Sequence, residues 1–259
     1  MNILSLAFAH IMKTPNWFLK KNFIAYLLLP FSFVYKIFSK LVFFIKGRAP
    51  LRSKIPVICI GGIMAGGVGK TPIVREIAKR LNAPVVMRGY NGTRNSRLGT
   101  RVLSSDSAIE VGDEAKMLSK DLNIYVGDRR LNIQTINRVP CNAIVLDDGF
   151  QNPTVHKDIS ILVFDGRLGI GNGFLLPAGP LRETLHDGIS RADAVIIIGS
   201  NDLLKSDIQN IKNIPVFAAK THAVRPKIRG RVIGFAGLGY PEKFHRTLKV
   251  LDFKVEIQS

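Results

Sequence analysis

A glycine-rich turn that ends in a lysine and a threonine has the residue types needed to bind nucleotide phosphates. It reads GGVGKT over residues 66–71 and follows the apolar run Val57–Ile60. Glycines let backbone N–H groups point into a concavity that wraps phosphate oxygens, and the following helix N-terminus adds partial positive charge. Lys70 is expected to reach the β- and γ-phosphates, and the Thr71 hydroxyl to ligate Mg²⁺. The residues expected to surround the phosphates are Gly66, Gly67, Val68, Gly69, Lys70 and Thr71.

This turn departs at one position from the strict P-loop pattern G-x-x-x-x-G-K-[ST]. The first glycine of that pattern falls on Met64. An alternative is therefore open, in which the stretch is an ordinary glycine-rich connection between a strand and a helix. The flanking residues favour phosphate binding, because an apolar strand precedes the turn and a helical pattern follows it over residues 72–81.

Asp147 and Asp148 form a second group of residues suited to chemistry. They end the run CNAIVLDD over residues 141–148, and Gln151 follows after a Gly-Phe pair. Four apolar residues before an acidic pair are typical of a buried parallel strand that delivers carboxylates to the carboxyl edge of a sheet. The Mg²⁺ partner of a phosphate loop lies at that edge. An Asp-Asp-Gly turn is common by itself, but behind this strand and after this loop it predicts a functional pair.

A third group is the acidic pair Asp113 and Glu114, which opens a predicted helix that continues as AKMLSK. Near a helix N-terminus, carboxylates stabilise the helix dipole without taking part in any reaction. The residues themselves are equally consistent with that role and with a catalytic one.

Arginines are concentrated in two places after the glycine-rich turn. Arg182 and Glu183 follow two prolines in rigid turns near the predicted sheet edge, and Arg182 is suited to bind a phosphate through two hydrogen bonds. The other group occupies one loop and strand and consists of Arg88, Arg94, Arg97 and Arg101. This second group is either a solvated basic face or part of a site for an anionic substrate.

The order of these elements predicts an α/β fold. At least six short apolar strands alternate with helices, which is typical of an open, mostly parallel, doubly wound sheet. Two cysteines in apolar runs are too few for a disulfide framework and lack the spacing of zinc ligands, so a reducing cytosol is expected. We expect three parts: membrane-associating helices (1–50), a nucleotide-binding domain (51–200), and a linker with an incomplete second α/β domain (201–259).

Basic residues dominate the start of the chain. The net charge is +18, and no Asp or Glu occurs before Glu76. Such a segment predicts an anionic partner, either a membrane surface, a nucleic acid or a phosphorylated substrate. The uncharged, aromatic-rich window 22–35 is shorter than the ~20 residues that a membrane-spanning helix needs. We expect a pair of helices in the membrane interface, and the alternative is a helix packed on the protein's own core.

Several motifs can be read together: GGVGKTP (66–72), RGY (88–90), GDE (112–114), DDGFQ (147–151) and LPAGPLRE (176–183). With the later stretch FAGLG…PEKF-x-RTL over 235–248, they closely resemble the tetraacyldisaccharide 4′-kinase family of lipid A biosynthesis. The resemblance runs over nearly the whole chain. It also accounts for Met64, because the loop of that family lacks the first glycine as well.

The resemblance implies an enzyme on the cytoplasmic face of the inner membrane. Its substrates would be ATP, with Mg²⁺, and an anionic acylated disaccharide lipid, tetraacyldisaccharide 1-phosphate, which is phosphorylated on the 4′-hydroxyl. Asp113 matches the general base of the family, and Thr71 and Asp147 match metal ligands. The remaining matches are Lys70, Asp148 and Arg182 as catalytic residues, Gln151 and Glu183 as nucleotide-site residues, and Tyr90 and Arg129 as weaker assignments.

One motif of the family is missing from this sequence. The family continues with a Phe-Pro-Asp-His-type motif whose histidine supports the catalytic Asp, whereas the sequence ends at Ser259 before it. We therefore expect nucleotide binding to survive better than transfer, with low turnover or none. Two alternatives are a remnant that binds only nucleotide or membrane, and a nucleic-acid-dependent P-loop ATPase. Basic residues interleaved with aliphatic ones make nucleic acid the less expected partner, and no protein partner can be inferred.

Overall fold

Runs of β-branched residues form the central sheet of the computed structural model, which describes residues 15–90, 92–94, 98–223, 232–234, 241–251 and 255–257. The strands are β1 (Val57–Gly61), β2 (Val85–Met87), β3 (Thr100–Arg101), β4 (Ile124–Val126), β5 (Ile144–Asp147), β6 (Ile159–Asp165), β7 (Ala194–Ile198) and β8 (Val216–Ala219). They make one eight-stranded sheet in the order β3-β4-β2-β5-β1-β6-β7-β8. Only β3 runs antiparallel to its neighbour, so the predicted mostly parallel α/β sheet is confirmed.

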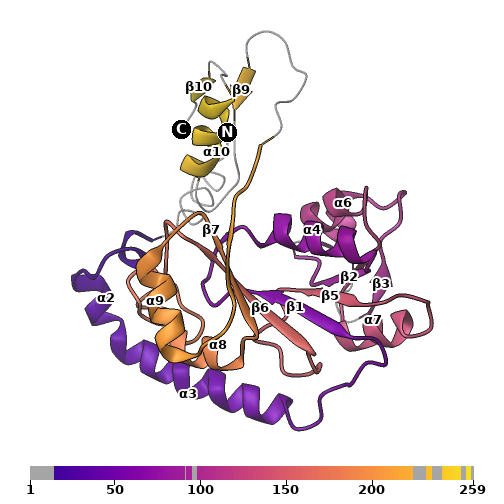
Figure 1. Cartoon of the computed structure of the whole chain (residues 1–259), viewed down its shortest axis with the longest axis horizontal. Coiled ribbons are helices and arrows are strands. Elements are labelled where there is room, and N and C mark those ends of the chain that lie inside the picture. The colour runs from indigo at the N-terminus through magenta and orange to yellow at the C-terminus, as the bar shows by residue number, and fades with distance from the viewer. Residues whose placement is uncertain are drawn as a thin grey trace.

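Helices cover both faces of this sheet (Figure 1). They are η1 (Asn16–Phe18), α2 (Phe23–Leu27), α3 (Leu29–Lys46), α4 (Lys70–Leu81), α5 (Ala108–Val111), α6 (Asp113–Leu118), α7 (Arg129–Ile136), α8 (Leu185–Arg191) and α9 (Asp202–Ile211). Val74 of α4 and Leu118 of α6 belong to one buried apolar cluster, whereas Ile133 of α7, Ile189 of α8 and Ile208 of α9 belong to the other. The two clusters on opposite faces make the sheet doubly wound.

The strand order places the two strongest sequence motifs next to each other. β1 lies between β5 and β6, and Ile60 of β1 is in register with Asp147 of β5. The chain leaves β1 toward the glycine-rich turn and leaves β5 toward Asp148. Because parallel strands end at the same edge, the turn and the acidic pair meet at the carboxyl edge of the sheet.

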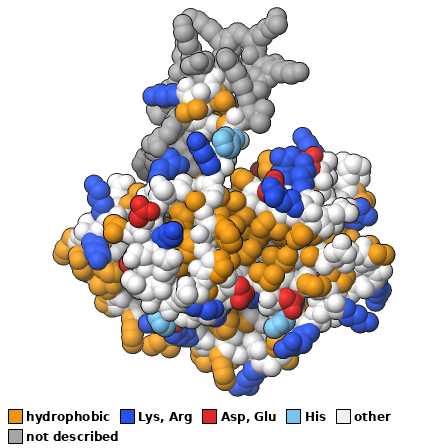
Figure 2. Space-filling view, viewed as in Figure 1, with side chains coloured by type: hydrophobic (Ala, Val, Ile, Leu, Met, Phe, Trp, Pro, Cys, Tyr) orange, Lys and Arg blue, Asp and Glu red, His pale blue; other side chains and the backbone are white. Residues whose placement is uncertain are grey.

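One part of the sheet carries apolar side chains that helices leave uncovered. Strand alternation places Ile58, Ile161 and Ile196 on the face where α4–α6 pack, and these side chains are only partly buried. Ile159 and Phe217 are 43% and 56% exposed. Figure 2 shows hydrophobic side chains gathered in the middle of the view, over the strands of the sheet, with most Lys and Arg side chains around them.

The helix α3 runs along the outside of the molecule, next to α8 and α9 in Figure 1. Pro30 lies in its first turn, where a proline costs no helical hydrogen bond. Most of its large apolar side chains are exposed: Phe31, Phe33, Val34, Ile37, Phe38, Leu41, Val42, Phe44 and Ile45. Ser32 is its one buried residue. Within the described ranges, no helix has both the length and the apolar character that crossing a bilayer requires.

A small second group of elements stands apart from the large sheet, at the top of Figure 1. It consists of β9 (Val232–Gly234), α10 (Pro241–Val250) and β10 (Val255–Ile257). β9 and β10 pair in parallel, with Val232 opposite Val255. The sequence predicts a linker with an incomplete second α/β domain over 201–259, and the exact division of the chain into three parts stays a prediction.

Candidate active site

The glycine-rich turn connects β1 to α4 in a form that suits an anion. Gly66 has φ 107° and Gly69 has φ 88°, which lie in the left-handed region that favours glycine. Gly69 is the N-cap of α4 and has no side chain to occupy the free N–H groups of the first turn. A Cβ added at Gly67 would meet no atom within 4 Å, so the outer side of the turn is open. Backbone N–H groups at the start of α4 are therefore available to phosphate oxygens.

Lys70 and Arg182 converge on the carboxylate of Asp148. Lys70 Nζ lies 3.3 Å from Asp148 Oδ1, and Arg182 Nη1 lies 3.0 Å from Oδ2. Burial by itself raises the pKa of Asp148, but the two cations outweigh it and hold this pKa below its usual range. Asp148 also has φ 49°, which is uncommon for a residue other than glycine and is found at functional sites. The structure thus brings together three of the residues predicted for catalysis.

Asp147 has the properties of a ligand for a cation. It is 6% exposed, and its Oδ1 has no hydrogen-bond partner among the described residues. Burial is the main cause that raises its pKa to about 7, with Glu114 adding repulsion and Lys70 opposing it. An unpartnered buried carboxylate oxygen beside a phosphate loop fits Mg²⁺, which binds to one or two carboxylates and otherwise to phosphates and water. The described residues hold no cluster of three or more His, Cys, Asp or Glu that could bind a metal.

The acidic pair Asp113 and Glu114 lies at the N-terminus of α6, as predicted. Asp113 is the first residue of this helix, and its side chain is exposed. Glu114 accepts a hydrogen bond from the Thr71 hydroxyl, which places the start of α6 against the start of α4. The Thr71 hydroxyl and the Glu114 carboxylate both offer oxygen atoms as metal ligands next to the phosphate loop. Together with Asp147 they make up an oxygen-rich set suited to Mg²⁺.

Gln151 and Glu183, expected at the nucleotide site, lie beside Arg182: the Oε1 of Gln151 is 3.5 Å from Arg182 Nη1, and Glu183 is the next residue in the chain. Gln151 Nε2 donates to Glu183 Oε1 at 2.9 Å and to the carbonyl oxygen of Gly62 at 3.0 Å. Because Gly62 follows β1 directly, these bonds fasten the loop that carries Arg182 and Glu183 to the end of that strand. The roles of the individual residues stay predictions, whereas their proximity is observed.

The two weaker assignments differ in their surroundings. Arg129 opens α7, and its Nη2 donates to the carbonyl oxygen of Asp148 at 3.1 Å. Burial lowers the pKa of Arg129, and its buried Nε has no partner in the described part of the chain. Tyr90, in contrast, is 76% exposed. Arg129 therefore supports the turn after β5 directly, while Tyr90 is free to contact a ligand.

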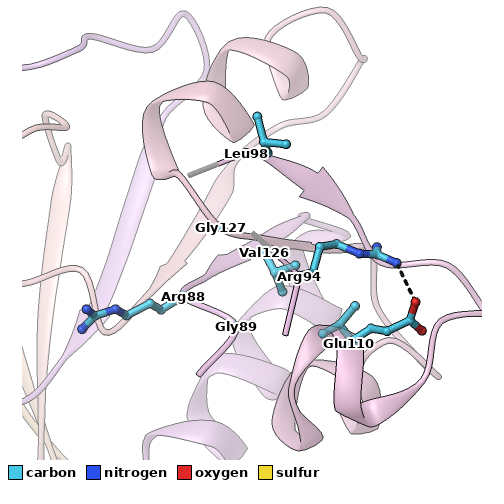
Figure 3. Close-up of a pocket in the computed structure, with 8 residues that line it drawn as sticks. Arg88, Gly89, Arg94, Leu98, Glu110, Val126 and Gly127 are labelled. Atoms are coloured by element: carbon cyan, nitrogen blue, oxygen red, sulfur yellow. Dashed lines mark ion pairs between the residues drawn. The ribbon is translucent and has the colours of Figure 1, made fainter. Parts of the chain in front are cut away.

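The arginine-rich loop is mostly engaged with the protein itself. Arg94 pairs with Asp106, with one nitrogen–oxygen distance of 2.6 Å, and lies 3.8 Å from Glu110. Figure 3 shows Arg94 and Glu110 on one side of a small pocket and Arg88 pointing away from them. The pocket has a volume of about 10 Å³, room for no more than a water molecule. Arg101 donates to Asn123, and Arg97 lies outside the described residues. This loop is therefore braced internally and is not a basic face open to a ligand along its whole length.

Sequence reasoning overlooked Arg191, whose guanidinium forms an ion pair with Glu183. A single arginine at the end of an ordinary helix carries no motif, so its position could be found only in the folded chain. The bond between Thr71 and Glu114 was equally hidden, because the two residues are 43 positions apart.

The chain matches proteins of known function over most of its length. The family model described as Tetraacyldisaccharide-1-P 4'-kinase matches residues 24–259. A protein from Phenylobacterium zucineum named tetraacyldisaccharide 4'-kinase is 42% identical over 77% of this chain and 63% of its own. Its namesake from Parvibaculum lavamentivorans is 39% identical over 88% of this chain and 68% of its own. This chain thus spans about two thirds of the length of these relatives.

A solved structure supports the same relationship. The crystal structure of LpxK from Aquifex aeolicus in complex with ATP aligns with a TM-score of 0.69 and 27% sequence identity. The alignment covers 90% of this chain and 80% of that one. The shared sheet, the family match over residues 24–259 and the relatives above agree. The chain belongs to the tetraacyldisaccharide 4′-kinase family.

Proposed function

We propose that this protein transfers the γ-phosphoryl group of ATP to the 4′-hydroxyl of tetraacyldisaccharide 1-phosphate. The observation that carries the proposal is the convergence of Lys70 and Arg182 on Asp148 at the open phosphate loop. Membership of the kinase family, and the ATP in the related LpxK structure, support the same activity. They favour it over a nucleic-acid-dependent ATPase.

In this proposal the nucleotide phosphates lie on the turn 66–69 and the first turn of α4. The backbone N–H groups there bind phosphate oxygens, and Lys70 places a positive charge near the β- and γ-phosphates. Thr71 and Asp147 would hold Mg²⁺, with Glu114 positioned by its bond to Thr71. The ion would neutralise charge on the phosphates. Lys70 and Arg182, now paired with Asp148, are the residues available to bind the charge on the transferred group.

Asp113 is the proposed general base. Its exposed carboxylate opens α6, next to the Glu114 that contacts Thr71. Asp113 would accept the proton of the 4′-hydroxyl while the sugar oxygen bonds to the γ-phosphorus and the bond to the bridging oxygen of ADP breaks. Such a reaction depends on positioning and charge neutralisation more than on covalent chemistry.

The experiment that tests this function measures label transfer from γ-labelled Mg·ATP to tetraacyldisaccharide 1-phosphate in detergent micelles. Lys70→Ala is the blank, and Lys79→Ala, on the exposed side of α4, is the matched control. Label in the lipid for the wild type and the control, but not for the blank, supports the kinase. Absent label with intact binding of an ATP analogue would leave only a nucleotide-binding protein. Absent nucleotide binding would overturn the proposal.

We also propose that α2 and α3 lie in the interface of the inner membrane, on its cytoplasmic face. The support is the row of exposed apolar residues on α3, with Lys36, Lys40 and Lys46 on the same helix. Buried in the acyl boundary, such a helix keeps its lysines at anionic headgroups. ATP and anionic lipid are both available at the cytoplasmic leaflet, where the enzyme would reach a lipid substrate that stays in the bilayer.

Flotation with lipid vesicles tests the membrane proposal. The double variant Phe31→Ser and Phe38→Ser should lose binding to anionic vesicles, because the two exposed rings would no longer be buried in lipid. Leu203→Ser, which alters an 81% exposed side chain on α9, is the control and should float like the wild type. Unchanged flotation of the double variant would overturn the proposal. Salt-dependent DNA binding without vesicle binding would instead favour the nucleic-acid alternative.

A further inference from the structure

Arg191, the last residue of α8, is held between two aromatic rings from different parts of the chain. Its guanidinium carbon lies 4.8 Å from the centre of the Phe43 ring in α3 and 4.5 Å from that of Phe150, which follows β5. The negative faces of both rings attract the cation. A planar guanidinium can stack in this way and still direct its N–H donors outward. Arg191 therefore joins the outer helix α3 to the turn after the acidic pair.

The donors of Arg191 are directed at the loop that carries Arg182. Nη2 forms an ion pair with Glu183, whose side chain is 13% exposed. Nη1 donates to the carbonyl oxygen of Phe150 at 3.4 Å, and Nε donates to that of Asp187 in its own helix at 3.3 Å. A charge-assisted bond of this kind fixes the orientation of the Glu183 carboxylate better than a bond between neutral groups.

From Glu183 the contacts continue to the residues predicted for catalysis. Glu183 accepts from Gln151 at 2.9 Å. The Oε1 of Gln151 lies 3.5 Å from Arg182 Nη1, and the same Nη1 contacts Asp148 at 3.0 Å. An unbroken series of side chains thus leads from Phe43 in α3 through Arg191 to the carboxylate that Lys70 also contacts.

We propose that Arg191 is a positioning residue for phosphoryl transfer, which rests on the function proposed above. By fixing Glu183 and Gln151, it sets the guanidinium of Arg182 against Asp148. Its contact with Phe43 makes that alignment depend on the seating of α3, the helix with the exposed apolar residues. Arg191 acts only through Glu183 and Gln151 and has no contact of its own with Lys70, Arg182 or the Asp148 side chain among the described contacts.

The first test separates positioning from binding and folding. Arg191→Met keeps an apolar chain between the rings but removes the ion pair, Arg191→Lys keeps the charge, and Arg80→Met removes an exposed ion pair of α4 as the control. We expect Arg191→Met to lower kcat about tenfold or more while the affinity for an ATP analogue changes less than about threefold. Arg191→Lys should recover part of the loss. Activity of Arg191→Met equal to that of Arg80→Met would overturn the proposal, as would a loss of ATP affinity equal to the loss of kcat.

A second readout does not depend on activity. The side-chain amide signals of Gln151 in a ¹⁵N NMR spectrum, assigned by their disappearance in Gln151→Glu, report its bonds to Glu183 and Gly62. Arg191→Met should shift these signals, Phe43→Leu should shift them less, and the double variant should match Arg191→Met alone, because both act through one contact. Unmoved signals in Arg191→Met would overturn the positioning role. If the wild type transfers no phosphate but these shifts occur, the proposed function fails and the link between α3 and the site stands.

Discussion

Arg182 lies with a single nitrogen, Nη1, between both carboxylate oxygens of Asp148, at 3.0 Å and 3.2 Å. Lys70 approaches the same carboxylate at 3.3 Å. The Asp148 carboxylate therefore bridges the two cations beside the phosphate loop, to which Lys70 belongs. Only Nη1 of Arg182 contacts Asp148, so the guanidinium has further N–H donors left for a phosphate.

Replacing Arg182 by lysine should lower kcat about 10- to 100-fold, because an ammonium cannot bind Asp148 and a phosphoryl oxygen with the same planar geometry. The KM for ATP should change much less, since the loop and Lys70 are untouched. Steady-state kinetics in micelles checks this. Arg75→Lys, which alters an exposed ion pair with Asp121 on α4, is the matched control. Equal kinetics for the two variants would contradict the assignment.

The Mg²⁺ requirement should depend on the Thr71 hydroxyl. Thr71→Val removes an oxygen next to Glu114, and we expect the Mg²⁺ concentration for half-maximal activity to rise about tenfold or more. Thr135→Val is the control, because the Thr135 hydroxyl only bonds within α7, to the carbonyl oxygen of Leu131 at 3.0 Å. A titration of activity with Mg²⁺ measures both. If both variants need the wild-type concentration, Thr71 is not a ligand.

Local patterns were enough to predict the phosphate loop, the acidic pair and the mostly parallel sheet. Gly66 and Gly69 have positive φ, and Asp147 ends a strand whose residues are all buried. The residue types of each short segment are therefore enough to indicate the loop and the buried strand. Arg182 could be assigned to the same edge because it follows two prolines in rigid turns. In each case the signal lies within a few residues of the functional group.

Contacts between distant segments left no such signal. Ser32 is a single serine in an apolar helix, and only the folded chain reveals that it bonds a loop more than a hundred residues away. The arginines that the sequence left as either a solvated basic face or part of an anion site are divided, because Arg94 pairs with Asp106 while Arg88 points elsewhere. Such pairings depend on how distant segments pack in the folded chain, which the spacing of residues along the sequence does not reveal.

The outer helix α3 should be fastened to the loop before Arg182 through Ser32. The buried Ser32 hydroxyl donates to the carbonyl oxygen of Leu175 at 2.8 Å and accepts from the N–H of Ala178 at 3.1 Å. Ser32→Ala leaves both backbone groups without these bonds and should lower the free energy of unfolding by about 1–3 kcal/mol. Ser39→Ala, which removes a bond within α3 only, should cost less than about 0.5 kcal/mol. Urea denaturation compares them, and equal losses would refute the role of Ser32.

The pair of Arg94 and Asp106 should make stability depend on acid. The hydrogen bond from Arg94 is the main cause that holds the pKa of Asp106 below its usual range, and the N–H of Leu103 adds a second bond. The Asp106 carboxyl thus binds a proton more readily in the unfolded chain than in the folded protein. The stabilisation of the fold by its charge is complete above its unfolded pKa of about 3.9 and is lost as pH falls through its lower folded pKa.

Asp106→Asn tests this dependence. It should lower the melting temperature at pH 7, and the difference from the wild type should shrink as pH falls below about 4, because the wild type then loses the same charge. Asp207→Asn, an exposed substitution on α9, is the control and should follow the wild type at every pH. Melting curves between neutral and acidic pH decide the matter. A difference between Asp106→Asn and the wild type that stays constant with pH would mean that the carboxylate charge contributes nothing to the fold.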